Sequence, residues 1–319
     1  MSNPCAVLVL GGAGFVGSNI ACLMARHGHR VAVLDGLLPN TGGRSENLES
    51  VRKQITFLST TIEETERLAE IVAEYDCVVD AMAWTSHQDA MRNPVYDLTL
   101  NARSHLALFA CVPALAGKKL IFLGSRGQYG DPKTAAILDD TAMLPEDIQG
   151  IHKVAAESYF RVFSKCHGLD AVALRFPNCF GRCQRTTGSD IGLVGSFIRD
   201  ALAGHAIEVY GASRTRCVVY AQDVANVVSR LCTIPSTGFQ GFNMSGQQIT
   251  IKELAATIVR LVGRGTVVER RMPQEISAIE MGDAVMNQQK LMSGIGRIPK
   301  TSLDESLTDT IAYFNEARA

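Results

Sequence analysis

The feature that most constrains the fold of this chain is a short apolar segment that runs directly into a glycine-rich loop. Ala6–Leu10 contains only apolar residues, and glycine then occupies positions 11, 12, 14 and 17. Phe15–His27 follows with the apolar spacing of a helix. A strand buried on both faces has this continuous apolar character. The order of strand, glycine turn and helix therefore predicts the first unit of a parallel α/β sheet.

The same alternation continues to residue 175, as expected for right-handed crossovers between parallel strands. Further buried strands are predicted at Arg30–Asp35, Cys77–Ala81, Lys119–Gly124 and Asp170–Arg175. The helices between them are predicted at Thr61–Tyr75, Pro94–Cys111 and Gln149–Cys166. We therefore expect a doubly wound parallel sheet built from residues 1–175, with about 221–241 added.

The rest of the chain, 176–220 and 242–319, has a different pattern and predicts a smaller mixed α/β lobe. Glycine and arginine become denser from Gly181 to Gly195. Short strands are predicted at Ile207–Tyr210 and Cys217–Tyr220, and helices at Ile251–Val262 and Asp304–Phe314. A further helix is predicted at Gln222–Leu231, in the segment of about 221–241 that is added to the large sheet. No linker rich in proline or glycine separates the two parts, so we expect them to pack closely.

Composition excludes several classes of partner. The 31 Lys and Arg residues are balanced by 32 Asp and Glu residues, so there is no broad basic field for nucleic acid. No apolar run approaches the roughly 18 residues that span a bilayer, and Met1–Leu10 lacks the positive start of a signal peptide. The nine cysteines are odd in number and scattered, which favours a reduced, cytoplasmic protein.

The glycine loop and the acid after the second strand predict a dinucleotide site. Gly11 permits a tight turn, Gly14 lets the backbone approach a pyrophosphate, and Gly17 lets the helix pack against the sheet. The first helical turn, which contains Phe15 and Val16, offers N–H groups to phosphates. Asp35 follows Gly17 by 18 residues, where a carboxylate accepts hydrogen bonds from ribose hydroxyls and repels a 2′-phosphate. NAD is therefore expected rather than NADP.

The chain resembles the extended short-chain dehydrogenase/reductase superfamily, and within it the nucleotide-sugar epimerases and dehydratases. Besides the glycine loop, the matching segments are Asp80–Ala83, Asn93-Pro94 with Asn101, Leu123–Asp131, Leu174–Gly181, Thr215–Val224 and Pro299–Leu303. The resemblance implies a Rossmann domain, bound NAD and a nucleotide-sugar substrate between the lobes. It also implies a homodimer formed by the helices around Leu98–Cys111 and Gln149–Cys166.

The resemblance also implies a set of site residues. In such enzymes NAD⁺ takes a hydride from a sugar carbon while a tyrosine of a Tyr-x-x-x-Lys motif removes the hydroxyl proton. Lys153 would hold the nicotinamide ribose and Ser125 the reacting sugar oxygen. Cofactor contacts are expected from Gly11, Gly14, Phe15, Val16, Gly17, Asp35, Thr61, Ile62, Ala81, Met82, Ala83, Asn101, Lys153 and Phe176. Substrate contacts are expected from Trp84, His87, Ser125, Arg126, Asn178 and Arg216.

The main departure from the family is at the tyrosine position, where this chain has Gln149. A glutamine amide forms hydrogen bonds but does not exchange protons near neutral pH. The proton could instead be moved by His152, by His87, or by a water relayed through Gln149 and Lys153, and an engineered substitution is a further alternative. Tyr129 and Lys133 have the motif spacing, but Gly130 and Pro132 break a helix between them, so we reject this pair.

Other departures narrow the chemistry. Arg126 and Gly127 stand where family dehydratases have an acidic pair, which argues against that chemistry and against the decarboxylase branch. Glu280 replaces a diphosphate-binding arginine, and Thr61 replaces an aspartate beside adenine. Trp84 is expected either to stack on a sugar or base or to fill the interface between the lobes.

The sequence leaves two functions open and predicts no metal site. Cys179 and Cys183 are four residues apart, but no other residues complete a set of four ligands, so we expect free thiols. We expect an NAD-dependent nucleotide-sugar epimerase or related oxidoreductase with an atypical proton-transfer residue. The alternative is a catalytically inactive NAD-binding relative that acts as a partner or regulator in a sugar pathway.

Overall fold

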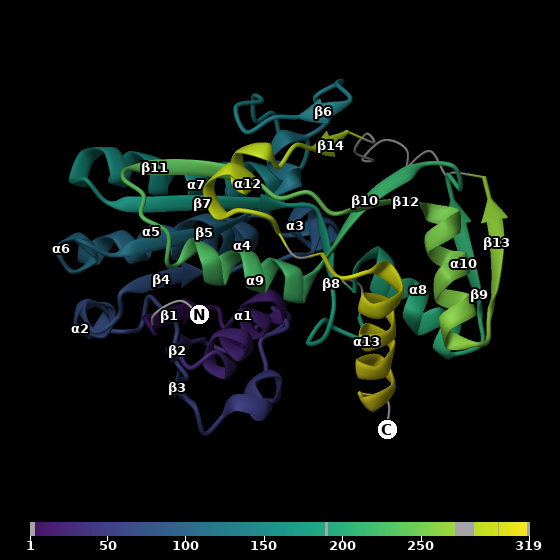
Figure 1. The fold of residues 1–319 in the computed structure, drawn as a ribbon, viewed down its shortest axis with the longest axis horizontal. Coiled ribbons are helices and arrows are strands. Elements are labelled where there is room, and N and C mark those ends of the chain that lie inside the picture. Colours follow the sequence, from purple (N-terminus) through teal and green to yellow (C-terminus); the bar gives the residue numbers. More distant parts are fainter. Residues whose placement is uncertain (1–3, 189–190, 272–283, 299, 318–319) are drawn as a thin grey trace.

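The centre of the molecule is a parallel sheet of seven strands. A computed structural model describes residues 4–188, 191–271, 284–298 and 300–317. Every neighbouring pair in the sheet is parallel. In spatial order the strands are β11 (Phe239–Asn243), β7 (Asp170–Phe176), β5 (Lys119–Ser125), β4 (Cys77–Asp80), β1 (Ala6–Leu10), β2 (Arg30–Leu34) and β3 (Ile55–Leu58). Figure 1 shows this sheet with helices in front of it and behind it.

The continuous apolar runs are explained by burial of both faces of the sheet. Val7 and Val9 pack into one core with helices α1 (Phe15–Arg26), α9 (Ala221–Leu231) and α12 (Gln289–Ile295). Leu8 and Leu10, which point the other way, pack into a second core. The helices of this second face are α2 (Leu68–Ala73), α6 (Val112–Leu115) and α7 (Ile148–His167). The predicted doubly wound fold is confirmed.

The structure adds edge strands and shortens one predicted helix. The five predicted strands are present as β1, β2, β4, β5 and β7, and the outer strands β3 and β11 complete the sheet. The helix predicted over Thr61–Tyr75 is wrong in extent, because α2 begins only at Leu68. Thr65 Oγ1 donates to the Thr61 carbonyl at 2.7 Å, and the Glu64 amide donates to Thr61 Oγ1 at 3.2 Å. Such local bonds compete with helix formation.

The segment predicted as a helix over Pro94–Cys111 is helical but irregular. It comprises α4 (Pro94–Leu98), a π-helical turn at Thr99–Arg103, α5 (Ser104–Ala107) and a 3₁₀ turn at Leu108–Cys111. The residues just before it form a further short helix, α3 (His87–Arg92). Asn93 caps α4 by accepting a hydrogen bond from the Tyr96 amide at 3.2 Å. The remaining short turns are η1 (Ser45–Val51) and η4 (Arg126–Tyr129).

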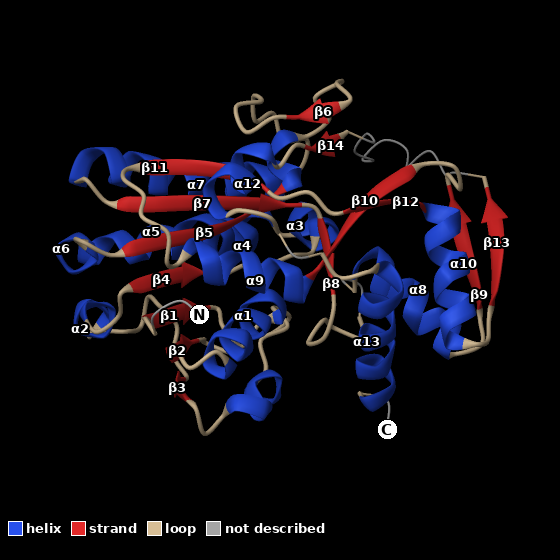
Figure 2. Cartoon of the chain, in the orientation of Figure 1, coloured by secondary structure: helices blue, strands red, loops and turns tan. Residues whose placement is uncertain are grey.

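A third core lies beside the large sheet, toward the right in Figure 2. Its helices are α8 (Gly192–Leu202), α10 (Ile251–Val262) and α13 (Leu303–Glu316). Its strands pair as β9 (Ala206–Tyr210) with β13 (Thr266–Arg270), and as β10 (Thr215–Tyr220) with β8 (Asn178–Phe180) and β12 (Gln247–Thr250). A small pair, β6 (Ala136–Ile137) with β14 (Val285–Met286), lies apart from these. The sequence did not indicate α8, and the domain boundaries stay a prediction.

Helices that could cross a membrane are not found among the described residues: none combines sufficient length with sufficient apolar character.

Candidate active site

A cavity of about 500 Å³ lies at the carboxyl ends of the central strands, where ligands bind in sheets of this kind. The sequence-predicted residues that line it are Gly11, Gly14, Phe15, Val16, Asp35, Thr61, Ile62, Ala81, Met82, Ala83, Trp84, His87, Ser125, Arg126, Gln149, Lys153, Phe176 and Asn178. The fold therefore gathers most of the predicted site. Gly17, Asn101, His152 and Arg216 are not among the lining residues.

The glycine loop forms a backbone cradle at one end of the cavity. Gly11 has φ +68°, and a Cβ there would lie 2.9 Å from Met82 Cα on the neighbouring strand connection. A Cβ at Gly17 would lie only 2.4 Å from the Gly11 carbonyl oxygen, so Gly17 serves close packing rather than contact with the cavity. Helix α1 starts after Gly14 without a side-chain cap. Its first N–H groups therefore meet the cavity, an arrangement that suits phosphate oxygens.

Asp35 is fixed near this cradle. Its Oδ2 accepts a hydrogen bond from the Ala13 amide at 2.9 Å, and its Oδ1 accepts one from the Leu37 amide at 2.8 Å. Burial raises the pKa of Asp35, while hydrogen bonds from Leu37, Ala13 and Gly14 oppose the rise. A rigid carboxylate beside an uncapped helix start fits the adenosine half of a dinucleotide.

Gln149 and Lys153 lie one turn apart on α7 at the other end of the cavity. Gln149 Nε2 donates to the Trp84 carbonyl at 2.8 Å. Lys153 Nζ donates to the carbonyls of Met82 at 3.1 Å and Leu123 at 3.4 Å, and lies 5.0 Å from the centre of the Phe122 ring. Burial lowers the pKa of Lys153 to about 8, although Asp80 and Asp97 act in the opposite direction.

Ser125 ends β5 and begins a tight turn. Its Oγ accepts a hydrogen bond from the Gly127 amide at 3.1 Å, and its own amide donates to Gln128 Oε1 at 2.7 Å. Gln128 Nε2 donates to Glu157 at 2.7 Å, and Glu157 forms a buried bidentate pair with Arg175 at 2.5 and 2.9 Å. We did not predict Gln128, Glu157 or Arg175 as parts of the site. The sequence offered one indication of this pair: Arg175 is a charged residue at the end of an apolar, buried strand, where a charge needs a buried partner.

His87 also lines the cavity, and its partner was not predicted. Its Nδ1 lies 2.8 Å from Oδ2 of Asp147, the residue that caps α7. Asp147 Oδ1 accepts a hydrogen bond from the Gly150 amide at 2.7 Å. The pKa of Asp147 is lowered: burial acts to raise it, but bonds from His87 and from the amides of Gly150 and Gln149 outweigh that effect.

His152 and Asn101 lie outside the cavity lining and belong to one hydrogen-bond network. His152 Nδ1 lies 2.5 Å from Asp97 Oδ1, and Asp97 Oδ2 accepts a hydrogen bond from Asn101 Nδ2 at 2.8 Å. Asn101 also bonds to the Trp84 amide at 3.0 Å and the Trp84 carbonyl at 2.8 Å. Both residues thus hold the segment at Trp84 from outside the cavity, because the π-helical turn rotates Asn101 into the packing between helices.

Two other predicted residues have a defined setting. Trp84 is buried, lines the cavity and packs edge-on against Tyr96 at a ring distance of 4.9 Å. Arg216 lies half-buried on β10, outside the cavity lining, and its Nη1 donates to the Thr215 carbonyl at 3.0 Å. The substrate contact of Arg216 therefore stays a prediction.

The rejected tyrosine lies elsewhere. Tyr129 is fully buried, donates to Asn243 Oδ1 at 2.7 Å and accepts a bond from Arg175 at 2.6 Å. Lys133 has φ +54° and pairs with Asp131 at 2.7 Å. Tyr129 and Lys133 therefore share no helical face.

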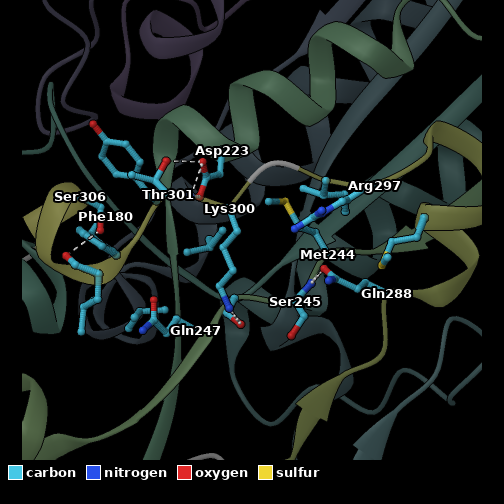
Figure 3. A pocket seen from close by; sticks show the side chains of 17 residues that line it. Phe180, Asp223, Met244, Ser245, Gln247, Gln288, Arg297, Lys300, Thr301 and Ser306 are labelled. Atoms are coloured by element: carbon cyan, nitrogen blue, oxygen red, sulfur yellow. Dashed lines mark hydrogen bonds between the residues drawn. The ribbon is translucent and has the colours of Figure 1, made fainter.

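A second, smaller cavity of about 250 Å³ lies between β10, α9 and the chain that enters α13. Figure 3 shows Asp223 and Lys300 in its wall. Asp223 accepts hydrogen bonds from Thr301 N at 3.1 Å and Thr301 Oγ1 at 2.8 Å, which tie α9 to the start of α13. This cavity contains none of the residues predicted for catalysis or cofactor binding.

Two further sequence expectations concern the cysteines Cys179 and Cys183 and the acidic residue Glu280. Among the residues that the structure describes, no group of three or more His, Cys, Asp or Glu side chains is placed to hold a metal ion. Cys179 is a half-buried free thiol, and desolvation raises its pKa well above the usual value. Glu280 lies outside the described residues.

Comparisons with known proteins agree with this geometry. A model of the NAD dependent epimerase/dehydratase family matches residues 7–244. A UDP-glucose 4-epimerase of Mycolicibacterium smegmatis is 27% identical over 317 residues, covering 96% of this chain and 97% of that protein. The UDP-glucose 4-epimerase of Thermus thermophilus, solved with NAD, has TM-score 0.83 and 28% identity, covering 98% of this chain and 99% of that one. The Thermotoga maritima enzyme, solved with UDP-glucose, has TM-score 0.85 and 26% identity, covering 98% and 100%.

Proposed function

The chain belongs to the NAD-dependent epimerase/dehydratase family, and we propose that it inverts or oxidises a carbon of a nucleotide sugar through a transient keto-sugar. The observation that carries this proposal is one cavity that joins the glycine cradle and Asp35 to Ser125, Gln149 and Lys153. The relatives named above, UDP-glucose 4-epimerases of similar length, support the nucleotide sugar as the substrate class.

NAD is the cofactor, and the chain's own residues fit it. The α1 N-terminus and the glycine cradle would hold the pyrophosphate, and Asp35 would accept bonds from the adenosine ribose. Lys153 would hold the nicotinamide ribose. When bound, NAD⁺ supplies a two-electron acceptor for the hydride of the sugar carbon, and the reduced form supplies the hydride for its return.

The sugar is proposed to lie beside Ser125. Because Ser125 Oγ already accepts a bond from the Gly127 amide, its own hydrogen is available to the sugar oxygen. Arg126 and Asn178 line the same part of the cavity and supply polar contacts for the sugar and its diphosphate. The buried pair of Glu157 and Arg175 stabilises this turn through Gln128.

Gln149 is proposed to occupy the position of the family's tyrosine. Its Nε2 is committed to the Trp84 carbonyl, and within the described residues its Oε1 has no hydrogen-bond partner. Oε1 can therefore accept a bond from a sugar hydroxyl, but an amide does not carry a proton between ground states near neutral pH. The enzyme thus needs a different residue for proton transfer.

A homodimer is supported by apolar side chains exposed on three neighbouring helices behind the sheet in Figure 1. Val95 and Leu98 on α4 are 71% and 46% exposed, and Leu106 on α5, Ile151 and Val162 on α7 are also exposed. Exposed apolar side chains on neighbouring helices are typical of an interface between protein chains. Leu98→Glu is expected to give monomers in analytical ultracentrifugation, while Leu144→Glu, at an exposed leucine outside these helices, leaves dimers.

The nine cysteines are all free thiols, which supports a reducing, cytoplasmic location. Purified protein should carry extractable NAD and should convert one member of a panel of UDP-, GDP-, CDP- and dTDP-hexoses, followed by NMR of the sugar. Ser125→Ala should lose this turnover, while Ser158→Ala, whose hydroxyl bonds within α7 to the Val154 carbonyl, should keep it. Bound NAD with every sugar unchanged would favour the inactive NAD-binding relative instead.

A further inference from the structure

Few side chains in the cavity can exchange a proton near neutral pH. The titratable groups among its described lining residues are Asp35, Glu63, His87, Arg126, Lys153, Cys179 and Arg185. Asp35 and Glu63 are carboxyls associated with the glycine cradle and α5, and arginine stays protonated. Cys179 is half-buried, and desolvation raises the pKa of its thiol well above the usual value. His87 and Lys153 remain.

Lys153 is already engaged as a donor. Its ammonium donates hydrogen bonds to two backbone carbonyls. A carbonyl oxygen only accepts hydrogen bonds, so these partners cannot reprotonate Lys153 after it has given up a proton. His87 differs, because its imidazole is about half exposed to the cavity and its Nδ1 is bound by a carboxylate. Histidine also has the pKa that suits acid–base chemistry at neutral pH.

The contact with Asp147 fixes the tautomer of His87. An ionised carboxylate only accepts hydrogen bonds, and the lowered pKa of Asp147 keeps it ionised at neutral pH. The 2.8 Å contact therefore makes Nδ1 the N–H donor. A neutral imidazole with its hydrogen on Nδ1 has its lone pair on Nε2, the nitrogen that would take a proton.

The imidazole of His87 and the hydroxyl of Ser125 both lie next to Gly127. A Cβ built at Gly127 would be 3.5 Å from Ser125 Oγ and 3.8 Å from His87 Cε1, so both groups border the same small space. A Cβ at Gly150 would lie 2.8 Å from the Gly127 carbonyl oxygen. The two glycines thus allow the Ser125 turn and the start of α7, with Asp147 and Gln149, to approach closely.

We propose that His87, held by Asp147, is the general base and acid of this enzyme in place of the absent tyrosine. The inference rests on the proposed nucleotide-sugar function. His87 Nε2 takes the proton from the sugar hydroxyl that Ser125 holds. The O–H electron pair becomes the second bond of the keto group, and the C–H pair leaves as the hydride that oxidised NAD accepts. On return of the hydride to carbon, His87 gives the proton back to oxygen, while Asp147 stays ionised throughout.

The main test removes the imidazole and then supplies it from solution. His87→Ala should lower kcat by about 10²-fold or more, the usual contribution of a general base, with a smaller change in KM. Added imidazole should restore part of the rate to His87→Ala. His167→Ala, at an exposed histidine in the last turn of the same helix as Gln149, should keep the wild-type kcat and show no response to imidazole. Wild-type kcat in His87→Ala would overturn the proposal.

Two further variants separate a proton carrier from a structural residue. Asp147→Asn keeps a capping side chain for α7 but removes the charge that orients the imidazole, so kcat should fall by about tenfold or more with an unchanged melting temperature. Gln149→Tyr introduced into His87→Ala should restore turnover, because a phenol regains a proton carrier beside Lys153. Two results together would overturn the proposal and assign His87 a structural role. In the first, the double variant is as inactive as His87→Ala, and in the second, imidazole does not restore the rate of His87→Ala.

The wild-type enzyme separates this proposal from the one on which it rests. If the wild type converts no sugar of the panel, the proposed function fails, and His87 has no reaction to serve. If the wild type converts a sugar and His87→Ala converts it equally fast, only the role of His87 fails. Conversion by the wild type, loss in His87→Ala and rescue by imidazole support both.

Discussion

Replacing Lys153 by methionine is expected to stabilise the protein while abolishing its activity. Lys153 is buried, and its ammonium contacts two carbonyls. Burial disfavours the charged form and lowers the pKa of Lys153 from 10.5 to about 8. The buried charge is thus a cost to the fold that the site retains for function.

The size and sign follow from the difference between the folded and unfolded pKa. A shift of about 2.5 units corresponds to about 3 kcal/mol at 1.36 kcal/mol per unit. Between pH 8 and 10.5 the unfolded chain binds more protons at Lys153 than the folded chain, so wild-type stability rises with pH in that window. The penalty is complete below pH 8 and absent above 10.5. Methionine removes it but also loses two carbonyl bonds of about 1 kcal/mol each, so Lys153→Met should gain about 1 kcal/mol at pH 7.

Urea unfolding of cofactor-stripped protein at pH 7 and pH 10 measures this gain. At pH 10, where most of the penalty on the wild type is gone, Lys153→Met should lose its advantage in unfolding free energy. Lys165→Met, at an exposed lysine of the same helix, should show no such pH-dependent difference from the wild type. Turnover of Lys153→Met should be lost. A variant that is less stable than the wild type at pH 7, or equally active, would refute the reasoning.

Three further changes test other parts of the site. Gln149→Tyr alone should retain turnover, since the position lines the cavity beside Lys153; loss of kcat in a folded variant would argue against its alignment with the family's tyrosine. Asp35→Ser should raise the dissociation constant of NAD by about tenfold or more, as expected for losing a charged acceptor. It should also bring the dissociation constants of NAD and NADP closer together. An unchanged ratio of the two dissociation constants would contradict the ribose contact. Arg175→Met should cost about 3–5 kcal/mol of unfolding free energy by leaving Glu157 buried and unpaired, and Glu157→Met added to it should recover part of that cost. Strictly additive losses in urea unfolding would show that the pair is not coupled.

The local parts of the fold were predictable because their physical causes are local. Ala6–Leu10 and the glycine loop indicated strand, turn and helix, and the structure has β1 and α1 at these positions. The helix over Thr61–Tyr75 was overextended, because apolar spacing does not reveal that Thr61 bonds to its neighbours. Edge strands such as β3 were missed, since a short, half-exposed strand lacks the continuous apolar pattern of a central one.

The site was predictable only in part. The motif positions identified Ser125 and Lys153 and the departure at Gln149, because each is read from a few adjacent residues. Such motifs could not predict side-chain contacts between residues that are far apart in the sequence. The sequence placed His152 among the catalytic candidates and His87 among the substrate contacts, and either could replace the tyrosine. In the folded chain His152 bonds Asp97 outside the cavity lining, while His87 lines the cavity.

What the sequence determined by itself was the order of buried strands and helices and the glycine cradle at Gly11–Gly17 with Asp35. It also predicted that Gln149 replaces the family's tyrosine. These depend on burial patterns and on backbone freedom within a few residues. What only the tertiary structure decided was which side chains share the cavity. Asp147 meets His87 across 60 residues, and Glu157 meets Arg175 across two packed elements. Such pairs depend on how closely α7 packs against its neighbours, including the turn at Gly127, and no local sequence pattern shows which distant residues this packing brings together.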